Sequence, residues 1–269
     1  MSQFKHCLAH WPLRYGPNLT IDQIVAIAKS LHCSGVELCP DNELEALKDA
    51  ELECPLYLPG FEDGTAPFAI GLAQPEQWGR VVPRVLSAID FAAKSGIPKV
   101  LVFTGCGGER EGWQTRCLQG LEKVAAHAEA NGVVLVLEHL NDVDLSHPMK
   151  GHEGYLGNRI AEVAAVVRDA KSPNVKLLFD AYHVQLTEGA VVPHIGDFGD
   201  LIGHFHVAGV RGRGSLAAPG QQIDYREVMK ALKQTGYRGY VGQEFIFPDG
   251  ATAAVIRKQL QESLELCAA

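Results

Sequence analysis

The chain alternates between short apolar runs and amphipathic helical segments about eight times along its 269 residues. Runs such as VVLVLE and VKLLFD are almost continuously apolar, which is typical of strands that are covered on both faces. Between the runs, apolar residues recur every three or four positions, as in residues 21–31 and 113–130. Because strands that alternate with helices form parallel sheets, the pattern predicts an all-parallel α/β fold.

Eight strand-helix units in a chain of this length favour a (β/α)8 TIM barrel over an open doubly wound sheet. No stretch has the composition of a linker, so we predict a single domain over residues 1–269. The predicted strands are residues 4–9, 35–38, 51–59, 99–103, 133–138, 175–180, 201–208 and 239–245. The predicted helices are residues 21–31, 42–50, 75–95, 113–130, 159–170, 184–199, 225–236 and 251–267, and residues 11–18 and 60–74 are predicted loops.

Composition and charge limit the kinds of molecule that this chain is expected to bind. A formal net charge of −8 argues against a nucleic-acid binder, which usually carries a basic face. No apolar run approaches the roughly 20 residues of a membrane span, and the first residues contain no signal-peptide core. Seven cysteines without a CxxC pair indicate free thiols in a reducing compartment, so we expect a cytoplasmic protein.

Four predicted strands in the second half of the chain carry a carboxylate or an imidazole at their carboxyl end or within two residues of it. These residues are Glu138, Asp180, His206 and Glu244. Catalytic groups of a TIM barrel lie at the carboxyl ends of its strands, so four successive strand ends can converge at one rim. Three carboxylates and one imidazole suit a divalent cation, with Mg2+ or Mn2+ favoured and Zn2+ or Co2+ as alternatives.

A single acid at a strand end is often only a solvated loop residue or a helix cap, but four on successive strands favour a metal site. His204 lies two residues before His206 and faces the same side of its strand, so either imidazole could be the ligand. We favour His206 because it lies nearer the carboxyl end of the strand.

Three further side chains are candidates for substrate contact. His183 follows Asp180 by three residues and is expected at the same rim of the barrel, although it could simply begin a helix. Arg211 and Arg213 lie in the loop after the seventh predicted strand, where a guanidinium could bind an anionic substrate or remain solvated. Trp11 could line the open end of the barrel at this rim, or it could be a packing residue.

The segments VLEHLN, FDAYHVQLTEG, IGHFHVAG and GYVGQEF resemble the motifs of the hydroxypyruvate isomerase-like family. This family belongs to the xylose isomerase-like TIM barrels and is related to the ketose 3-epimerases. The resemblance covers most of the chain and is strongest over residues 123–247. One departure is His206, because bacterial hydroxypyruvate isomerases carry Gln at this position, whereas the epimerases carry His as this chain does.

The resemblance implies a divalent metal held by Glu138, Asp180, His206 and Glu244, with the two glutamates also carrying protons. It implies substrate contacts for His183 and Arg213, and it suggests Asp144 as a further contact. Superfamily members are often dimers or tetramers, so a homo-oligomer is compatible with this chain.

The predicted reaction is an isomerisation through an enediolate, with hydroxypyruvate converted to tartronate semialdehyde. The main alternative is a ketose 3-epimerase that acts on a small sugar by the same proton transfers. A three-zinc apurinic-site endonuclease of the same superfamily is disfavoured, because the early strand ends offer too few ligands. A sugar-binding barrel without catalysis is the most distant alternative, because the four-residue set is intact.

Overall fold

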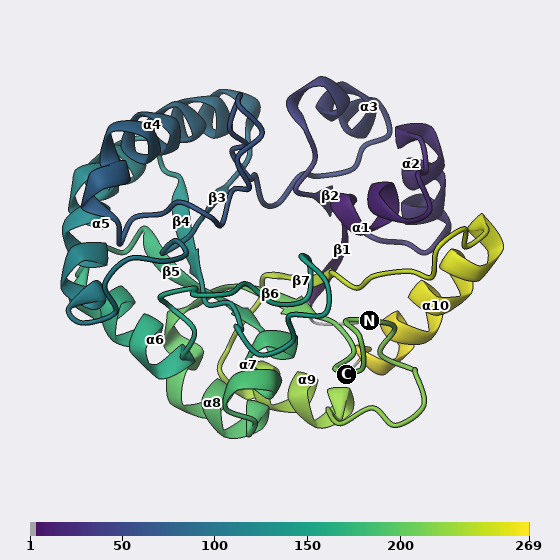
Figure 1. The fold of residues 1–269 in the computed structure, drawn as a ribbon. Helices are drawn as coiled ribbons and strands as arrows, with labels where there is room; N and C mark the ends of the chain where they lie inside the picture. The colour runs from purple at the N-terminus through teal and green to yellow at the C-terminus, as the bar shows by residue number, and fades with distance from the viewer. Residues whose placement is uncertain (1–3, 269) are drawn as a thin grey trace. The chain divides into compact units, whose positions relative to one another are not determined.

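The computed structural model describes residues 4–268 and divides them into two compact units. The first unit contains residues 4–55, Ala190–Asp200 and residues 205–268, and the second contains Leu56–Gly189 and Leu201–His204. Each unit is built from parallel strands with helices between them, as the alternating pattern predicts (Figure 1). The prediction of a single domain over residues 1–269 stays a prediction.

In the first unit the strands pair in the order β2, β1, β7 and the end of β6. Their bounds are Lys5–Ala9 for β1, Gly35–Glu37 for β2, Tyr240–Gln243 for β7 and Ile202–Val207 for β6. The helices are α1 (His10–Tyr15), α2 (Ile21–Ser30), α3 (Leu44–Asp49), α8 (Val191–Phe198), α9 (Tyr225–Gln234) and α10 (Ala253–Leu266), with a 3-10 turn η1 at Asp41–Glu43.

In the second unit the strand order is β3 (Lys99–Val102), β4 (Val134–Glu138) and β5 (Val175–Asp180). The helices are α4 (Trp78–Ser95), α5 (Trp113–Ala130), α6 (Ile160–Asp169) and α7 (Ala181–Thr187), and a 3-10 turn η2 (Pro75–Gln77) precedes α4. Helices α4, α5 and α6 follow one another along the outer side of these strands (Figure 1). Gly120 of α5 allows a close approach, because a Cβ there would meet the carbonyl of Leu72.

Side-chain caps mark the first residues of several helices. Thr20 and Gln23 form a reciprocal capping box at the start of α2. Asp224 accepts hydrogen bonds from the backbone N–H groups of Arg226 and Glu227 at the start of α9. Such caps satisfy N–H groups that have no partner within the helix, which fixes where the helix begins.

Three predictions of secondary structure are wrong. The predicted helix over residues 184–199 is interrupted after α7 by Ala190, whose φ of 49° is left-handed, and α8 begins at Val191. Residues 51–59 form no regular strand, and only two isolated parallel bridges occur there, Glu53 with Gly35 and Tyr57 with Val100. Pro55 and Pro59 lack the N–H that a continuous ladder needs, which explains the interruption. Most of the predicted loop at residues 11–18 is instead helix α1, whose Pro12 lies in the first turn, where a missing N–H does no harm.

Two absences concern membranes and disulfides. None of the helices in the described chain has the length and apolar character needed to cross a bilayer. No disulfide joins the seven cysteines, all of which lie within residues 4–268. The predicted free thiols are thereby confirmed, whereas the cytoplasmic location stays a prediction.

Candidate active site

The four predicted metal ligands all stand at or beside the carboxyl end of a strand. Glu138 and Asp180 are the last residues of β4 and β5, His206 is the penultimate residue of β6, and Glu244 follows β7 directly. All four side chains are buried. A buried carboxylate is costly unless it is paired, so these positions are unusual for residues that serve packing alone.

Within the first unit, His206 lies between two carboxylates. Its Nδ1 atom is 2.9 Å from Glu244 Oε2, and its Nε2 atom is 3.0 Å from Glu37 Oε1. Burial alone lowers the pKa of His206, but the charges of Glu244 and Glu37 outweigh it and raise the pKa well above the usual range. We call these residues, together with Arg213 and Trp11, the His206 cluster.

Glu244 is held by two further donors of the His206 cluster. Arg213 donates from a guanidinium nitrogen to Glu244 Oε2 at 2.6 Å, and the Trp11 indole donates to Oε1 at 2.7 Å. The Arg213 guanidinium also lies over the Trp11 ring, 5.2 Å from its centroid. Burial opposes ionisation of Glu244, but His206 and Arg213 together lower its pKa to about 2. The carboxylate is therefore ionised at neutral pH.

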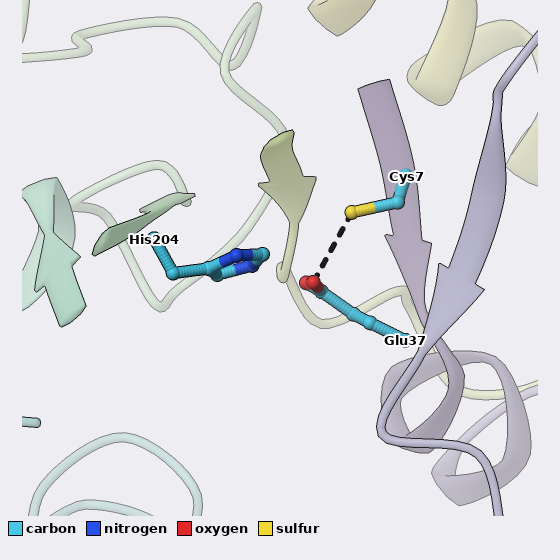
Figure 2. Close-up of side chains that lie close together, drawn as sticks. All are labelled: Cys7, Glu37 and His204. Atoms are coloured by element: carbon cyan, nitrogen blue, oxygen red, sulfur yellow. Dashed lines mark hydrogen bonds between the residues drawn. The ribbon is translucent and has the colours of Figure 1, made fainter. Parts of the chain in front are cut away.

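Glu37 is a member of this cluster that sequence reasoning missed. It is the last residue of β2, it is fully buried, and it accepts a hydrogen bond from the Cys7 thiol at 3.1 Å (Figure 2). The sequence analysis places Glu37 inside a predicted strand, residues 35–38, rather than at its end, so it did not match the pattern that identified Glu138 and Asp180. The expectation that the early strand ends offer too few ligands therefore did not include it.

Within the second unit, Asp180 and His183 come together as predicted. Asp180 caps α7 by accepting the backbone N–H of Tyr182 at 2.8 Å, and its Oδ2 atom lies 3.5 Å from His183 Nε2. The backbone N–H of Asn141 donates to His183 Nδ1 at 3.0 Å. Because that N–H can only donate, Nδ1 is an acceptor, and a neutral ring then carries its proton on Nε2. We call Glu138, Asn141, Asp180 and His183 the Asp180 cluster.

The sheet register places Glu138 on the same side as Asp180. Glu138 pairs with Leu178 of β5, and Asp180 follows Leu178 by two residues, so both carboxylates face the same side of the sheet. The Tyr155 hydroxyl donates to the backbone carbonyl of Glu138 at 2.8 Å and accepts from the N–H of Thr104 at 3.0 Å. This buried link fixes the end of β4.

Asn141 is a second residue that sequence reasoning missed. Its side-chain amide lies 2.6 Å from His183 Nδ1 and donates to the carbonyl of Lys150 at 2.7 Å. Its side-chain oxygen accepts the N–H groups of Val143 and Asp144 at 3.0 Å each. Its position 42 residues before His183 gave no local signal for this contact.

The remaining candidates have other surroundings. His204, the rejected ligand, has its Nδ1 atom 3.4 Å from Lys99 Nζ within the second unit. Asp144 is partly buried and lies 3.5 Å from the Tyr182 hydroxyl. Arg211 is exposed, whereas Arg213 is almost fully buried against Glu244. Arg213 is thus the arginine of the loop that approaches the predicted ligands.

Comparison with known proteins places this chain in a family. A sequence model described as "Xylose isomerase-like TIM barrel" matches residues 25–267. The chain belongs to this family. The predicted fold class, a TIM barrel, is thereby confirmed as the family's fold, and the resemblance stated above is confirmed with it.

Among curated relatives, the chain is similar to a protein of Drosophila melanogaster named putative hydroxypyruvate isomerase. The two are 30% identical over 161 residues, which cover 59% of this chain and 58% of the relative. The chain thus matches less than two thirds of the length of the curated relatives. Other curated relatives are named 2-oxo-tetronate isomerase and D-psicose 3-epimerase.

Solved structures support the fold. A D-psicose 3-epimerase from Clostridium cellulolyticum H10, crystallised with D-tagatose, aligns with a TM-score of 0.77, 19% identity and coverage of 98% of both chains. The IOLI protein with a bound zinc atom aligns with a TM-score of 0.75 and 16% identity, again covering 98% of both chains. At these identities the likeness concerns the fold.

Proposed function

We propose that the chain is a metal-dependent isomerase that moves a proton between neighbouring carbons of a small hydroxy-keto acid or sugar. Hydroxypyruvate is the first candidate substrate and tartronate semialdehyde the product. The observation that carries this proposal is the set of four buried donors at the ends of β4, β5, β6 and β7. The names of the curated relatives agree with it.

The donor set fits a divalent cation. Glu138, Asp180 and Glu244 offer carboxylate oxygens, and His206 offers the Nδ1 atom that faces Glu244. We propose these four residues as the ligands of one ion, since the barrel of this family brings the carboxyl ends of its strands to one rim. When bound, the ion would stabilise negative charge that develops on a substrate oxygen.

The side chains of the His206 cluster suit proton transfer and substrate orientation. Glu244 is ionised at neutral pH and is held by Arg213 and Trp11, so it can accept a proton at a fixed position. Arg213 has further N–H groups that can bind a substrate carboxylate or hydroxyl. We assign Glu244 to one of the two proton transfers and Arg213 to substrate binding.

The Asp180 cluster supplies the complementary groups. Glu138 is the second proposed proton carrier, and Tyr155 fixes the backbone from which it projects. His183 has its Nδ1 atom occupied by Asn141, so its Nε2–H is the group that can donate to a substrate oxygen. This tautomer supports the substrate-binding role proposed for His183.

A ketose 3-epimerase is the second candidate function. The observation that favours it is the imidazole of His206 in the ligand set, which is the ligand type implied for the epimerases. Both reactions begin with removal of a proton beside a carbonyl, and they differ in where the proton returns. A homo-oligomer stays a prediction for either function.

The test is proton exchange in D2O with hydroxypyruvate and a panel of small ketoses, each with Mn2+, Mg2+, Co2+ or Zn2+. We expect deuterium to enter the carbon beside the carbonyl only when a metal is present. Tartronate semialdehyde as product supports the isomerase, and inversion at C3 of a ketose supports the epimerase. Absence of exchange with every substrate and metal contradicts both and leaves the non-catalytic barrel.

A further inference from the structure

A second group of potential metal ligands lies in the first unit. It consists of His10 at the start of α1, Cys39 after β2, and Glu43 at the end of η1. One donor atom from each residue lies within 4.8 Å of the other two. We call these residues the Cys39 cluster, and none of them belongs to the proposed active site.

Glu43 is positioned so that each of its oxygens faces a different partner. Arg14 donates to Oε1 at 2.9 Å and also to the carbonyl of Leu19 at 2.6 Å. His10 Nε2 lies 2.7 Å from Oε2. The side chains of His10 and Glu43 are only 7% and 11% exposed, so water screens this pair little.

Cys39 distinguishes this cluster from the proposed active site, because its donor atom is a sulfur. It is 1% exposed, and no residue in the described part of the chain makes a hydrogen bond with its thiol. A structural cysteine usually packs against apolar groups, whereas here an imidazole nitrogen and a carboxylate oxygen lie within reach of the sulfur. Burial, Cys54 and Glu43 raise the pKa of this thiol, which makes a role as a free nucleophile unfavourable.

We propose that His10, Cys39 and Glu43 bind a thiolate-accepting divalent metal ion, with Zn2+ as the first choice. The donors are His10 Nε2, Cys39 Sγ and Glu43 Oε2, and a water molecule completes a tetrahedron. Zinc bond lengths of about 2.0–2.3 Å place tetrahedral donors roughly 3.3–3.6 Å apart, which the cluster can reach by small side-chain rotations.

The charge and proton balance are favourable. The thiolate and the carboxylate together neutralise the two positive charges of the ion, and the imidazole is neutral. Burial lowers the pKa of His10, although Glu43 opposes this, so its lone pair is available near neutral pH. On binding, the Cys39 thiol releases its proton to solvent, and the neutral His10 ring carries its own proton on Nδ1, so that Nε2 is the donor, while Arg14 keeps Glu43 Oε1.

The test uses Co2+ as a spectroscopic probe of the full chain. A thiolate ligand gives a near-ultraviolet charge-transfer band with Co2+, and the proposed active-site ligands contain no sulfur. We expect the band in the wild type and two bound metal ions per chain. Cys39→Ser should abolish the band and reduce the stoichiometry to one, while Cys33→Ser, which alters another buried cysteine, should retain both.

A wild type without the band, or a band that persists in Cys39→Ser, overturns the proposal. His10→Gln provides a second variant in case Cys39→Ser folds poorly, and we expect it to weaken Zn2+ binding at this cluster while the other ion remains bound. The expected stoichiometry of two rests on the ion of the proposed active site, whereas the thiolate band does not, so failure of the proposed function would leave the band unchanged.

Discussion

His206 and His183 are both fully buried, yet their partners differ in kind. His206 lies between the carboxylates of Glu37 and Glu244, whose charges favour a protonated ring in the metal-free protein. His183 has its Nδ1 atom fixed by an amide N–H of Asn141, which leaves Nε2–H as a donor. The difference shows how neighbours assign separate tasks to one residue type: His206 lies where a cation is favoured, and His183 presents a hydrogen-bond donor.

The largest expected effect comes from replacing the two glutamates that are proposed to share the proton transfers. Glu244→Gln and Glu138→Gln should each reduce kcat by about a thousandfold, because each removes a group that carries a proton. Steady-state rates and circular dichroism measure turnover and folding. The matched control is Glu262→Gln on the surface of α10, which should leave turnover unchanged. Retained activity in either active-site variant refutes the role assigned to that glutamate.

The next effect concerns Glu37, which contacts His206 from the side opposite to Glu244. Glu37→Gln should weaken metal affinity about 10- to 100-fold, because a carboxylate that orients a ligating histidine is lost. Calorimetric titration with Mn2+ measures this, and Cys7→Ser is the control that keeps the carboxylate.

The Glu37→Gln variant also tests the difference between His206 and His183. In nitrogen NMR of the metal-free protein, Glu37→Gln should lower the pKa of His206, whereas His183 should keep its proton on Nε2. An unchanged His206 titration in this variant contradicts the idea that neighbouring carboxylates set its charge.

A third effect is the pH dependence of stability in the metal-free protein. The pKa of Glu244 is about 2 in the folded state and about 4.3 in an unfolded chain. Its contribution is therefore present above pH 4.3 and is lost as the pH falls toward 2. His206 has a raised pKa, so its contribution is present below about pH 6.5 and is lost as the pH rises through the folded value.

Urea unfolding of the wild type and Glu244→Gln across this range measures the effect. The difference in unfolding free energy should be largest between about pH 4.3 and 6.5, because both groups contribute there. A difference that does not change with pH would show that the pair is not electrostatically coupled.

The smallest expected effect separates the two tasks of Asp180. Asp180→Asn keeps an oxygen that can cap α7, whereas Asp180→Ala removes it. The alanine variant should be less stable than the asparagine variant by about 1 kcal/mol, the usual cost of losing a helix cap. Both variants should bind metal weakly. Equal stability in urea unfolding would mean that the cap contributes nothing.

The sequence predicted most strands and the four proposed ligands because both depend on local patterns. An apolar run that ends in Glu138 or Asp180 can be read without knowledge of the tertiary structure. Glu37 was missed because β2 has only three residues, so the acid at its end did not stand out. Asn141 was missed because its role depends on a contact with His183, which lies far along the chain.

The errors in secondary structure have a similar origin. Residues 11–18 contain two prolines and a glycine, which favour a loop, but proline is compatible with the first turn of a helix, as Pro12 in α1 shows. At Pro55 and Pro59 the apolar character of the segment outweighed the missing N–H groups, and a strand was predicted where only bridges form. In both places the backbone position of proline decides the outcome.

Gly242 in β7 has a consequence for how this protein can vary. A Cβ at this position would collide with the Glu37 carboxylate and come within 2.9 Å of the His206 ring. Even alanine would therefore push apart the imidazole and the acid that orients it. Relatives that keep this acid and this imidazole together are expected to keep a residue without a side chain between them, so the three positions should change in concert.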